Sequence, residues 1–232
     1  MKIRFSSNQN DYDLVNSSEI NWRFKRGDVE NRDETCLNFD STAESFFDYF
    51  ILSVYWPPGL GYLYLTDKNK IRLNLANQKH WSIHGLWPSV INGEVPDKCH
   101  DLTQKFKFSV VHIKLAKDNL YGVLTNNWFN IVDMENPSSG IENFWRTEYD
   151  NHGACASHAQ SIQDDVGYFR TAIKMLNDMS LATKIRESGL SDGGSILLGT
   201  LYDKLTQSIG AKLKIIPAFD KVRTGKLLLN RN

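Results

Sequence analysis

The chain lacks several features that would assign it to a class at once. Its apolar runs stay below the roughly 20 residues that a membrane-spanning helix needs, so we expect no membrane partner. Its 27 basic and 27 acidic residues cancel, so no overall field attracts a polyanion. The N-terminus lacks the short apolar stretch of a secretory signal peptide. The chain has three cysteines, and that count alone assigns no redox compartment.

What is present suits a globular protein of one domain. The chain has 232 residues, of which 41% are hydrophobic and 12% aromatic, and this composition argues against a mainly disordered chain. Residues 1–45 are rich in charge, Asn and Ser and show little apolar periodicity, which predicts a polar N-terminal extension. The folded domain is then expected over residues 46–232.

Local patterns predict strands first and helices between and after them, which indicates an α+β fold. Within one of the predicted strands, the two-residue alternation places Ser82 and His84 on one face and Trp81 and Ile83 on the other. The predicted strands are 46–56, 79–89 and 213–217, and the predicted helices are 112–128, 141–159, 161–186 and 196–209.

Two segments carry the residues suited to chemistry. The first is HWSIHGLWPS, which contains His84, and the second is FWRTEYDNHGACAS, over residues 144–157. In the second, Glu148 and His152 are four apart, which on a helix places them on one face with Cβ atoms about 5–6 Å apart. His84 on a strand facing that helix would complete an acid–base pair.

Two histidines and a carboxylate are well suited to cleaving RNA. The substrate's own 2′-OH can attack the phosphate, so neither a protein nucleophile nor a metal or other cofactor is required. One imidazole must be neutral to accept the 2′-OH proton, and the other must be protonated to supply the leaving 5′-oxygen. The neutral net charge means that RNA would be held by local charge and by stacking on aromatic side chains.

Other interpretations remain open for the same residues. A lone histidine on a strand is usually a structural hydrogen-bonding group, and a Glu/His pair at this spacing is usually a surface pair. A zinc site is a third possibility, because Cys155 and His158 could pair with Cys99 and His100 as ligands. Cys155 and His158 have a spacing found in zinc sites, but Cys99 and His100 are adjacent and do not form a second well-spaced pair.

Taken together, IHGLWP (83–88) and FWRTEYDNHGAC (144–155) resemble the two signature blocks of the ribonuclease T2 family. FDYFILSVYWPP (47–58) resembles that family's first core strand, and the resemblance extends over residues 46–217. It implies a central antiparallel β-sheet packed with several helices. It also implies a metal-independent endoribonuclease that acts, as we expect, as a monomer on single-stranded RNA. The expected products are 2′,3′-cyclic phosphates and then 3′-phosphates, and the expected location is secreted or lysosomal/vacuolar.

The resemblance also implies a role for particular residues. His84 resembles the general acid, His152 the general base, and Glu148 the carboxylate that supports the phosphate and the histidines. Trp87 resembles the aromatic side chain that stacks on the base 5′ of the cut. Part of a second base site is expected at Pro137, Ser138 and Ser139.

Two positions depart from the family's pattern. Thr147 stands where the family usually has a phosphate-binding histidine, and Asn151 stands where it usually has a lysine. Both side chains are still expected to contact substrate, but losing one preorganised donor can cost about 10²–10³ in rate. We therefore expect reduced activity. The alternative is a relative that has lost most catalysis and acts by binding RNA or a protein partner.

The cysteines follow the family in part. Cys99 and Cys155 fall where the family has a disulfide that joins the two blocks, whereas Cys36 has no evident partner. Beyond Pro217 the resemblance fades, so we interpret the chain as a divergent or shortened member of the family.

Overall fold

The computed structural model describes part of the chain, and every structural statement below concerns that part. The described residues are 2–6, 47–63, 73–90, 96, 99, 107–131, 140–157, 159, 162–189, 196–209 and 212–216. None of the helices described there is both long enough and apolar enough to cross a membrane.

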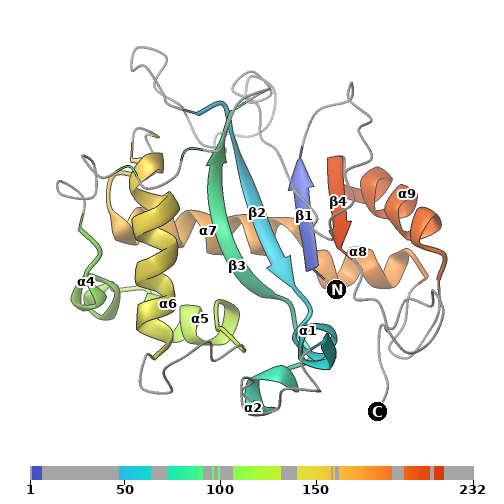
Figure 1. Cartoon of the computed structure of the whole chain (residues 1–232), viewed down its shortest axis with the longest axis horizontal. Helices are drawn as coiled ribbons and strands as arrows, with labels where there is room; N and C mark the ends of the chain where they lie inside the picture. The colour runs from blue at the N-terminus through green and yellow to red at the C-terminus, as the bar shows by residue number, and fades with distance from the viewer. Residues whose placement is uncertain are drawn as a thin grey trace.

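Four strands form a sheet at the centre of the described structure (Figure 1). They are β1 (Lys2–Ser6), β2 (Tyr49–Tyr55), β3 (Ser82–Ser89) and β4 (Lys212–Ile216). The strands are ordered β3-β2-β1-β4, and each neighbouring pair is antiparallel. Strands β2, β3 and β4 lie where the sequence predicts strands, and the predicted α+β fold with a central antiparallel sheet is confirmed.

The first strand departs from the predicted domain boundary. The sequence predicts a polar extension over residues 1–45, but Lys2–Ser6 form β1 in the interior of the sheet, between β2 and β4. A strand of five residues beside a charge-rich segment gives almost no periodic signal, and its partners are distant in sequence. These five residues thus belong to the sheet, whereas the division of the chain into an extension and a domain stays a prediction. The rest of the predicted extension, Cys36 included, lies outside the described residues.

A β-bulge interrupts the pairing of β2 with β3. Ser53 is opposite Gly85, whereas the next residue of β2, Val54, is opposite Ile83. His84 is therefore the extra residue on β3. Bulges bend a strand and re-aim side chains, and they are frequent next to active sites.

The bulge also changes which residues of β3 enter the core. Ile83 and Leu86 both belong to the main buried cluster although they are three positions apart, which a regular strand would not allow. Trp87 consequently packs in a separate cluster with Tyr49 and Ile51 of β2. The predicted alternation is correct for Trp81 and Ile83, which both lie in the main cluster, and its phase shifts after them.

Helices lie around the sheet, with α4, α5 and α6 beside β3 and α8 and α9 beyond β4 (Figure 1). The α-helices are α1 (Pro57–Leu63), α2 (Leu73–Ala76), α4 (Val110–Leu115), α5 (Leu120–Asn127), α6 (Ile141–Glu148), α7 (Asp165–Met179), α8 (Leu181–Glu187) and α9 (Leu198–Ile209). α6 continues into a π-helical turn and then a 3₁₀ turn, which are η2 (Tyr149–Gly153) and η3 (Ala154–Ala156).

Two of the predicted helices are each divided in two. The predicted helix 112–128 is interrupted between α4 and α5, where Ala116 is extended and Asn119 adopts a left-handed conformation with φ 53°. The predicted helix 161–186 is interrupted at Ser180, whose φ is 46°. A single left-handed residue breaks a helix but leaves the spacing of apolar side chains nearly intact. Periodicity therefore did not reveal either break.

The main core joins β2 and β3 to α5, α6 and α7, and it is unusually aromatic. Trp128, Trp145 and Phe169 are fully buried. The ring centroid of Phe169 lies 5.0 Å from that of Trp128 and 6.3 Å from that of Trp145. Such ring pairs contribute about 0.5–1.5 kcal/mol each beyond the area they bury. This aromatic layer contacts β3 at His84, whose carbonyl oxygen accepts a hydrogen bond from Trp128.

Candidate active site

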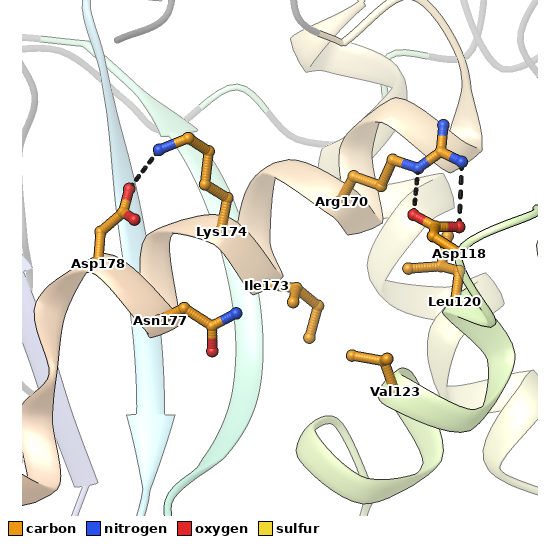
Figure 2. A pocket seen from close by; sticks show the side chains of 8 residues that line it. All are labelled: Asp118, Leu120, Val123, Arg170, Ile173, Lys174, Asn177 and Asp178. Atoms are coloured by element: carbon orange, nitrogen blue, oxygen red, sulfur yellow. Dashed lines mark hydrogen bonds and ion pairs between the residues drawn. The ribbon is translucent and has the colours of Figure 1, made fainter. Parts of the chain in front are cut away.

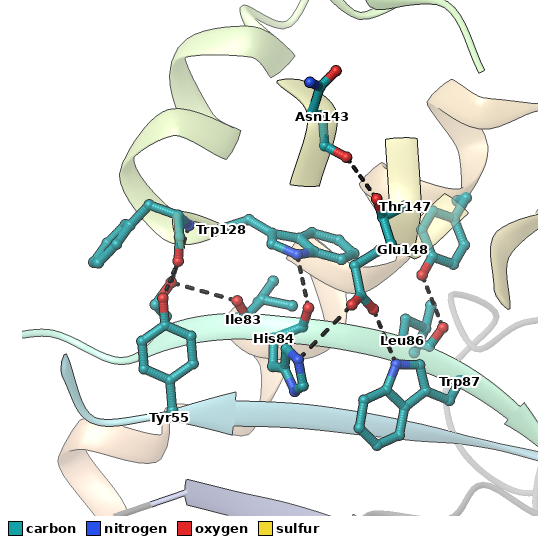
Figure 3. Close-up of polar contacts among 12 residues, drawn as sticks. Tyr55, Ile83, His84, Leu86, Trp87, Trp128, Asn143, Thr147 and Glu148 are labelled. Carbon is teal, nitrogen blue, oxygen red and sulfur yellow. Dashed lines mark hydrogen bonds and ion pairs between the residues drawn. The ribbon is translucent and has the colours of Figure 1, made fainter. Parts of the chain in front are cut away.

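The bulge residue His84 faces the end of helix α6. Its side chain is 29% exposed, and its Nε2 atom lies 3.8 Å from Oε1 of Glu148 (Figure 3). The imidazole also stands edge-on to the indole of Trp87, with ring centroids 5.3 Å apart, and stacks beside Phe144 at 6.2 Å. The imidazole is therefore partly open to solvent and lies beside a carboxylate.

Glu148 is the last residue of α6 and is buried, with 7% of its surface exposed. A buried carboxylate requires hydrogen-bond donors. Trp87 supplies one, because its Nε1–H donates to Oε2 of Glu148 at 3.1 Å (Figure 3). Glu148 therefore contacts two residues of the first sequence block, His84 and Trp87, through different oxygen atoms.

Gly85 allows this close approach. A Cβ atom at this position would lie 2.2 Å from Oε2 of Glu148 and 2.2 Å from Nε1 of Trp87. Any other residue would push these two groups apart. Gly85 was not among the site residues expected from the sequence, although its place directly after His84 in the first block was a possible signal.

His152 also packs against the indole of Trp87. The ring centroids of Trp87 and His152 are 5.5 Å apart, so Trp87 contacts both histidines. Only 9% of Trp87 is exposed, so the indole is a largely buried contact that the two imidazoles share. The structure thus brings together the four residues His84, Trp87, Glu148 and His152.

The backbone that carries His152 is the π-helical turn η2. The predicted regular helix is wrong at this point, so Glu148 and His152 do not share a simple α-helical face. A Cβ atom on Gly153 would lie 2.4 Å from Cδ2 of Tyr149, so the turn depends on glycine there. Single π turns within helices are rare overall, and those that occur are often found at functional sites.

The predicted disulfide is confirmed directly after this turn. Cys155 in η3 is bonded to Cys99, with Cα atoms 5.3 Å apart. The bond connects the segment that follows His152 to the chain beyond β3. It also contradicts the zinc alternative, because neither cysteine keeps a thiolate for a metal. His100 and His158 lie outside the described residues, among which no group of three His, Cys, Asp or Glu side chains could hold a metal ion.

Buried donors fix the backbone of β3 from behind. Nε1 of Trp128 donates to the carbonyl oxygen of His84 at 3.0 Å, and the hydroxyl of Tyr168 donates to that of Leu86 at 2.9 Å. Burial raises the pKa of Tyr168 well above its usual range, and the nearby charge of Glu148 raises it further. Tyr168 therefore keeps the proton with which it holds the strand.

The remaining predicted contacts are less well placed. Thr147 is exposed, and its hydroxyl donates to the carbonyl of Asn143 at 2.9 Å, so its proton is already used within α6 (Figure 3). Arg146, the residue before Thr147 and a cation that could lend charge to a phosphate, has its guanidinium over the ring of Phe108, 5.1 Å from its centroid. Asn151 is half-buried in η2. Pro137, Ser138 and Ser139 lie outside the described residues.

A separate pocket of about 270 Å³ lies between α5 and α7 (Figure 2). Its polar rim contains two ion pairs, in which Arg170 contacts Asp118 at 2.7 Å and Lys174 contacts Asp178 at 2.5 Å. Its lining includes no histidine and no member of the cluster around Trp87. This pocket is therefore not the candidate active site. Its lining residues are Asp118, Leu120, Val123, Arg170, Ile173, Lys174, Asn177 and Asp178.

Comparison with known proteins agrees with these features. The model of the ribonuclease T2 family matches residues 47–226, which is most of the chain. The chain belongs to the ribonuclease T2 family. The predicted family membership is thereby confirmed, and the match includes both blocks that meet at Trp87.

Individual relatives show how far this T2-family chain has diverged. It is 33% identical over 149 residues to ribonuclease T2 protein rnst-2 of Caenorhabditis elegans, covering 63% of this chain and 49% of that protein. It is 28% identical over 172 residues to ribonuclease 1 of Arabidopsis thaliana, covering 73% and 68%. The chain thus spans about half the length of the worm relative.

Solved structures support the fold. Ribonuclease MC1 from bitter gourd seeds superposes with a TM-score of 0.54 at 21% identity, covering 69% of this chain and 74% of that one. A variant of ribonuclease MC1 in complex with 5′-GMP gives 0.55 at 22% identity, covering 71% and 75%. At these identities, the likeness establishes the T2 fold and leaves the roles of single residues to the geometry of the site.

Proposed function

We propose that this chain is a metal-independent endoribonuclease that cleaves single-stranded RNA by transphosphorylation. The observation that carries the proposal is the placement of His84 and His152 against the same indole, with ring centroids 5.3 and 5.5 Å from that of Trp87. Two imidazoles in this arrangement can act on the two sides of one phosphate. Glu148, beside His84, supplies the carboxylate that such a pair needs.

In the proposed reaction, His152 accepts the proton of the 2′-OH while the 2′-oxygen attacks phosphorus. The bond from phosphorus to the 5′-oxygen breaks, and His84 donates a proton to that oxygen. The product is a 2′,3′-cyclic phosphate. Water then opens the cyclic phosphate to a 3′-phosphate, with His84 as base and His152 as acid.

Substrate contacts are proposed at the rim of the cluster. Trp87, of which 9% is exposed, stacks on the base 5′ of the cut, and Thr147 and Asn151 contact the phosphate. Pro137, Ser138 and Ser139 contribute to a second base site. Solved relatives are seen with 5′-GMP and with 5′-AMP, which supports a site for nucleotides in this fold.

The second candidate function is a weakened relative that binds RNA or a protein partner. It is favoured by Thr147, whose hydroxyl proton is bonded to Asn143, and by Arg146, whose guanidinium lies over Phe108. These contacts draw donors away from a phosphate but leave the two histidines in place. We therefore propose reduced turnover, not its loss.

The chain is further proposed to act as a monomer in a secreted or lysosomal/vacuolar compartment. The bond between Cys99 and Cys155 supports an oxidising environment, because disulfides rarely persist in the cytosol. Light scattering on the purified protein would test the monomer, and a dimer at micromolar concentration would contradict it.

The deciding experiment is cleavage of homopolymer RNA with a chelator present, between about pH 4 and pH 8. We expect a bell-shaped profile, because one histidine must be neutral and the other protonated, and a cyclic phosphate visible by ³¹P NMR. His152→Ala should lower kcat by about 10²–10⁴. The matched control is His112→Ala on α4, a histidine with 59% of its side chain exposed, which should leave cleavage unchanged. No cleavage at any pH, or cleavage stopped by the chelator, would refute the proposal.

A further inference from the structure

The carbonyl oxygen of His84 lies where β3 bulges. Ser53 and Val54 of β2 pair with Gly85 and Ile83, the residues on either side of His84. Its carbonyl oxygen accepts a hydrogen bond at 3.0 Å from Nε1 of Trp128, which lies just after α5 (Figure 3). Trp128 is fully buried, so this donor is not exchanged for water.

Trp128 is itself firmly held. Its backbone N–H donates to the carbonyl of Leu124 at 2.7 Å, and its carbonyl accepts a bond at 2.7 Å from Nε1 of Trp145. Its ring packs against Tyr168 and Phe169 of α7, with centroids 5.8 and 5.0 Å away. A side chain with this many fixed contacts can hold a backbone atom in one place.

Helix α6 is linked to both the imidazole and the backbone carbonyl of His84. Glu148 of α6 lies 3.8 Å from the imidazole of His84. Trp145, three residues earlier on α6, holds Trp128, which in turn holds the carbonyl of His84. The imidazole and the backbone of His84 are therefore fixed relative to one helix. This coupling would stop the bulge from turning the ring away from Glu148.

We propose that Trp128 is a positioning residue for the ribonuclease reaction. Its indole N–H holds the bulged backbone of His84 so that the imidazole stays beside Glu148. The proposal rests on the proposed function above. It differs from a purely structural role, in which Trp128 fills the core and its N–H bond has no bearing on the site.

The test removes the N–H and keeps the ring. We would introduce β-(3-benzothienyl)alanine at position 128, where sulfur replaces the indole N–H at nearly the same size. The control carries the same analogue at position 81, because Trp81 is also buried and flanks β3, packing on Trp56 at 5.4 Å. Readouts are kcat and KM on a dinucleoside monophosphate, the pH profile of kcat, and the NMR resonances of the His84 ring.

We expect the analogue at position 128 to lower kcat by about tenfold or more, since small misplacements of catalytic groups are costly. KM should stay within about twofold, because the bond is not a substrate contact. The bell-shaped pH profile should change. The His84 resonances should also shift, because the His84 ring lies 5.3 Å from the aromatic ring of Trp87 and would move relative to it. The analogue at position 81 should leave all four readouts as in the unmodified protein.

Each other outcome counts against the proposal. Equal behaviour of the two analogues would overturn it, and so would shifted His84 resonances with an unchanged kcat. If the analogue protein does not fold, Trp128→Phe removes the same N–H, and Trp81→Phe matches its loss of ring volume. If the unmodified protein cleaves no RNA, the proposed function fails, whereas unmoved His84 resonances would refute the positioning by itself.

Discussion

Replacing Gly85 with alanine would place a methyl group where Glu148 and Trp87 meet. The added Cβ would lie 2.2 Å from Oε2 of Glu148 and equally close to Nε1 of Trp87. These two atoms are joined by the 3.1 Å hydrogen bond that satisfies the buried carboxylate. The methyl group therefore cannot be accommodated without separating them.

The magnitude follows from three opposing effects. Alanine suits a strand better than glycine by about 0.5–1 kcal/mol, which favours the variant. Forcing an extra methyl group into a packed site costs about 1–3 kcal/mol. Losing a hydrogen bond to a charged group costs about 1.5–3 kcal/mol more if the carboxylate moves away. The steric and hydrogen-bond costs exceed the backbone gain, so we expect the free energy of unfolding to fall by about 1.5–5.5 kcal/mol.

The variant should lose most of its cleavage rate even where it remains folded. Glu148 would be displaced from His84, and a misplacement of about 1 Å can cost about 10²-fold in rate. Urea denaturation and initial rates on homopolymer RNA would measure the two effects. The control is Gly199→Ala in α9, where a Cβ atom meets nothing within 4 Å and a gain of up to about 1 kcal/mol is expected. Wild-type stability and kcat in Gly85→Ala would refute the close packing of Glu148 on β3.

Three further predictions concern the surroundings of the site. Reducing the disulfide, which joins residues 56 apart, should lower the free energy of unfolding by about 4 kcal/mol, and an unchanged urea midpoint would contradict this. The double variant Thr147→His, Asn151→Lys should raise kcat at least about tenfold in single-turnover assays, because one phosphate donor is worth about 10²–10³. A hydrogen bond from Arg170 lowers the pKa of Asp118 below 3.8, so their pair stabilises the protein above that pH and loses its effect as pH falls through the lowered value. Both side chains are about half exposed, so Asp118→Asn should cost only about 0.2–1 kcal/mol at neutral pH, and a cost that persists in strong acid would contradict the assignment.

The elements that the sequence predicted well have a local cause. The run that became β2 is buried along its whole length, and its aromatic and β-branched residues indicate a strand without reference to any partner. The spacing of apolar residues likewise predicted α9. Cys99 and Cys155 were paired correctly through the resemblance, because a disulfide position is fixed by the family's fold.

The features that the sequence did not predict depend on distant partners. The bulge at His84 is a mismatch between two strands, and neither strand contains it alone. The strand Lys2–Ser6 is defined by pairing with β2 and β4, which are far away in sequence. Ser180 breaks a helix through a single left-handed residue, and the break between α4 and α5 takes only the four residues 116–119, so both breaks leave the apolar pattern nearly unchanged.

The candidate site shows the same division. The sequence identified His84, Glu148 and His152 because their residue types suit acid–base chemistry at a phosphate. It did not show that Trp87 would contact both histidines, nor that Trp128 would hold the carbonyl of His84. Those contacts join separate elements, and they became visible only in three dimensions.

Both histidines lie on irregular backbone, which indicates how the site is specified. His84 is the extra residue of a β-bulge, and His152 lies in a π-helical turn. Regular strands and helices would direct these side chains by simple periodicity, whereas irregular turns can aim them elsewhere at a cost in local stability. Here Gly85 leaves room for Glu148 and Trp87 beside the bulge, and Gly153 leaves room for the ring of Tyr149 within the π-helical turn. The buried indole of Trp128 holds the backbone of the bulge. Substitutions in the aromatic core beside the site, at Trp128 above all, should therefore reduce the cleavage rate even when the protein remains folded.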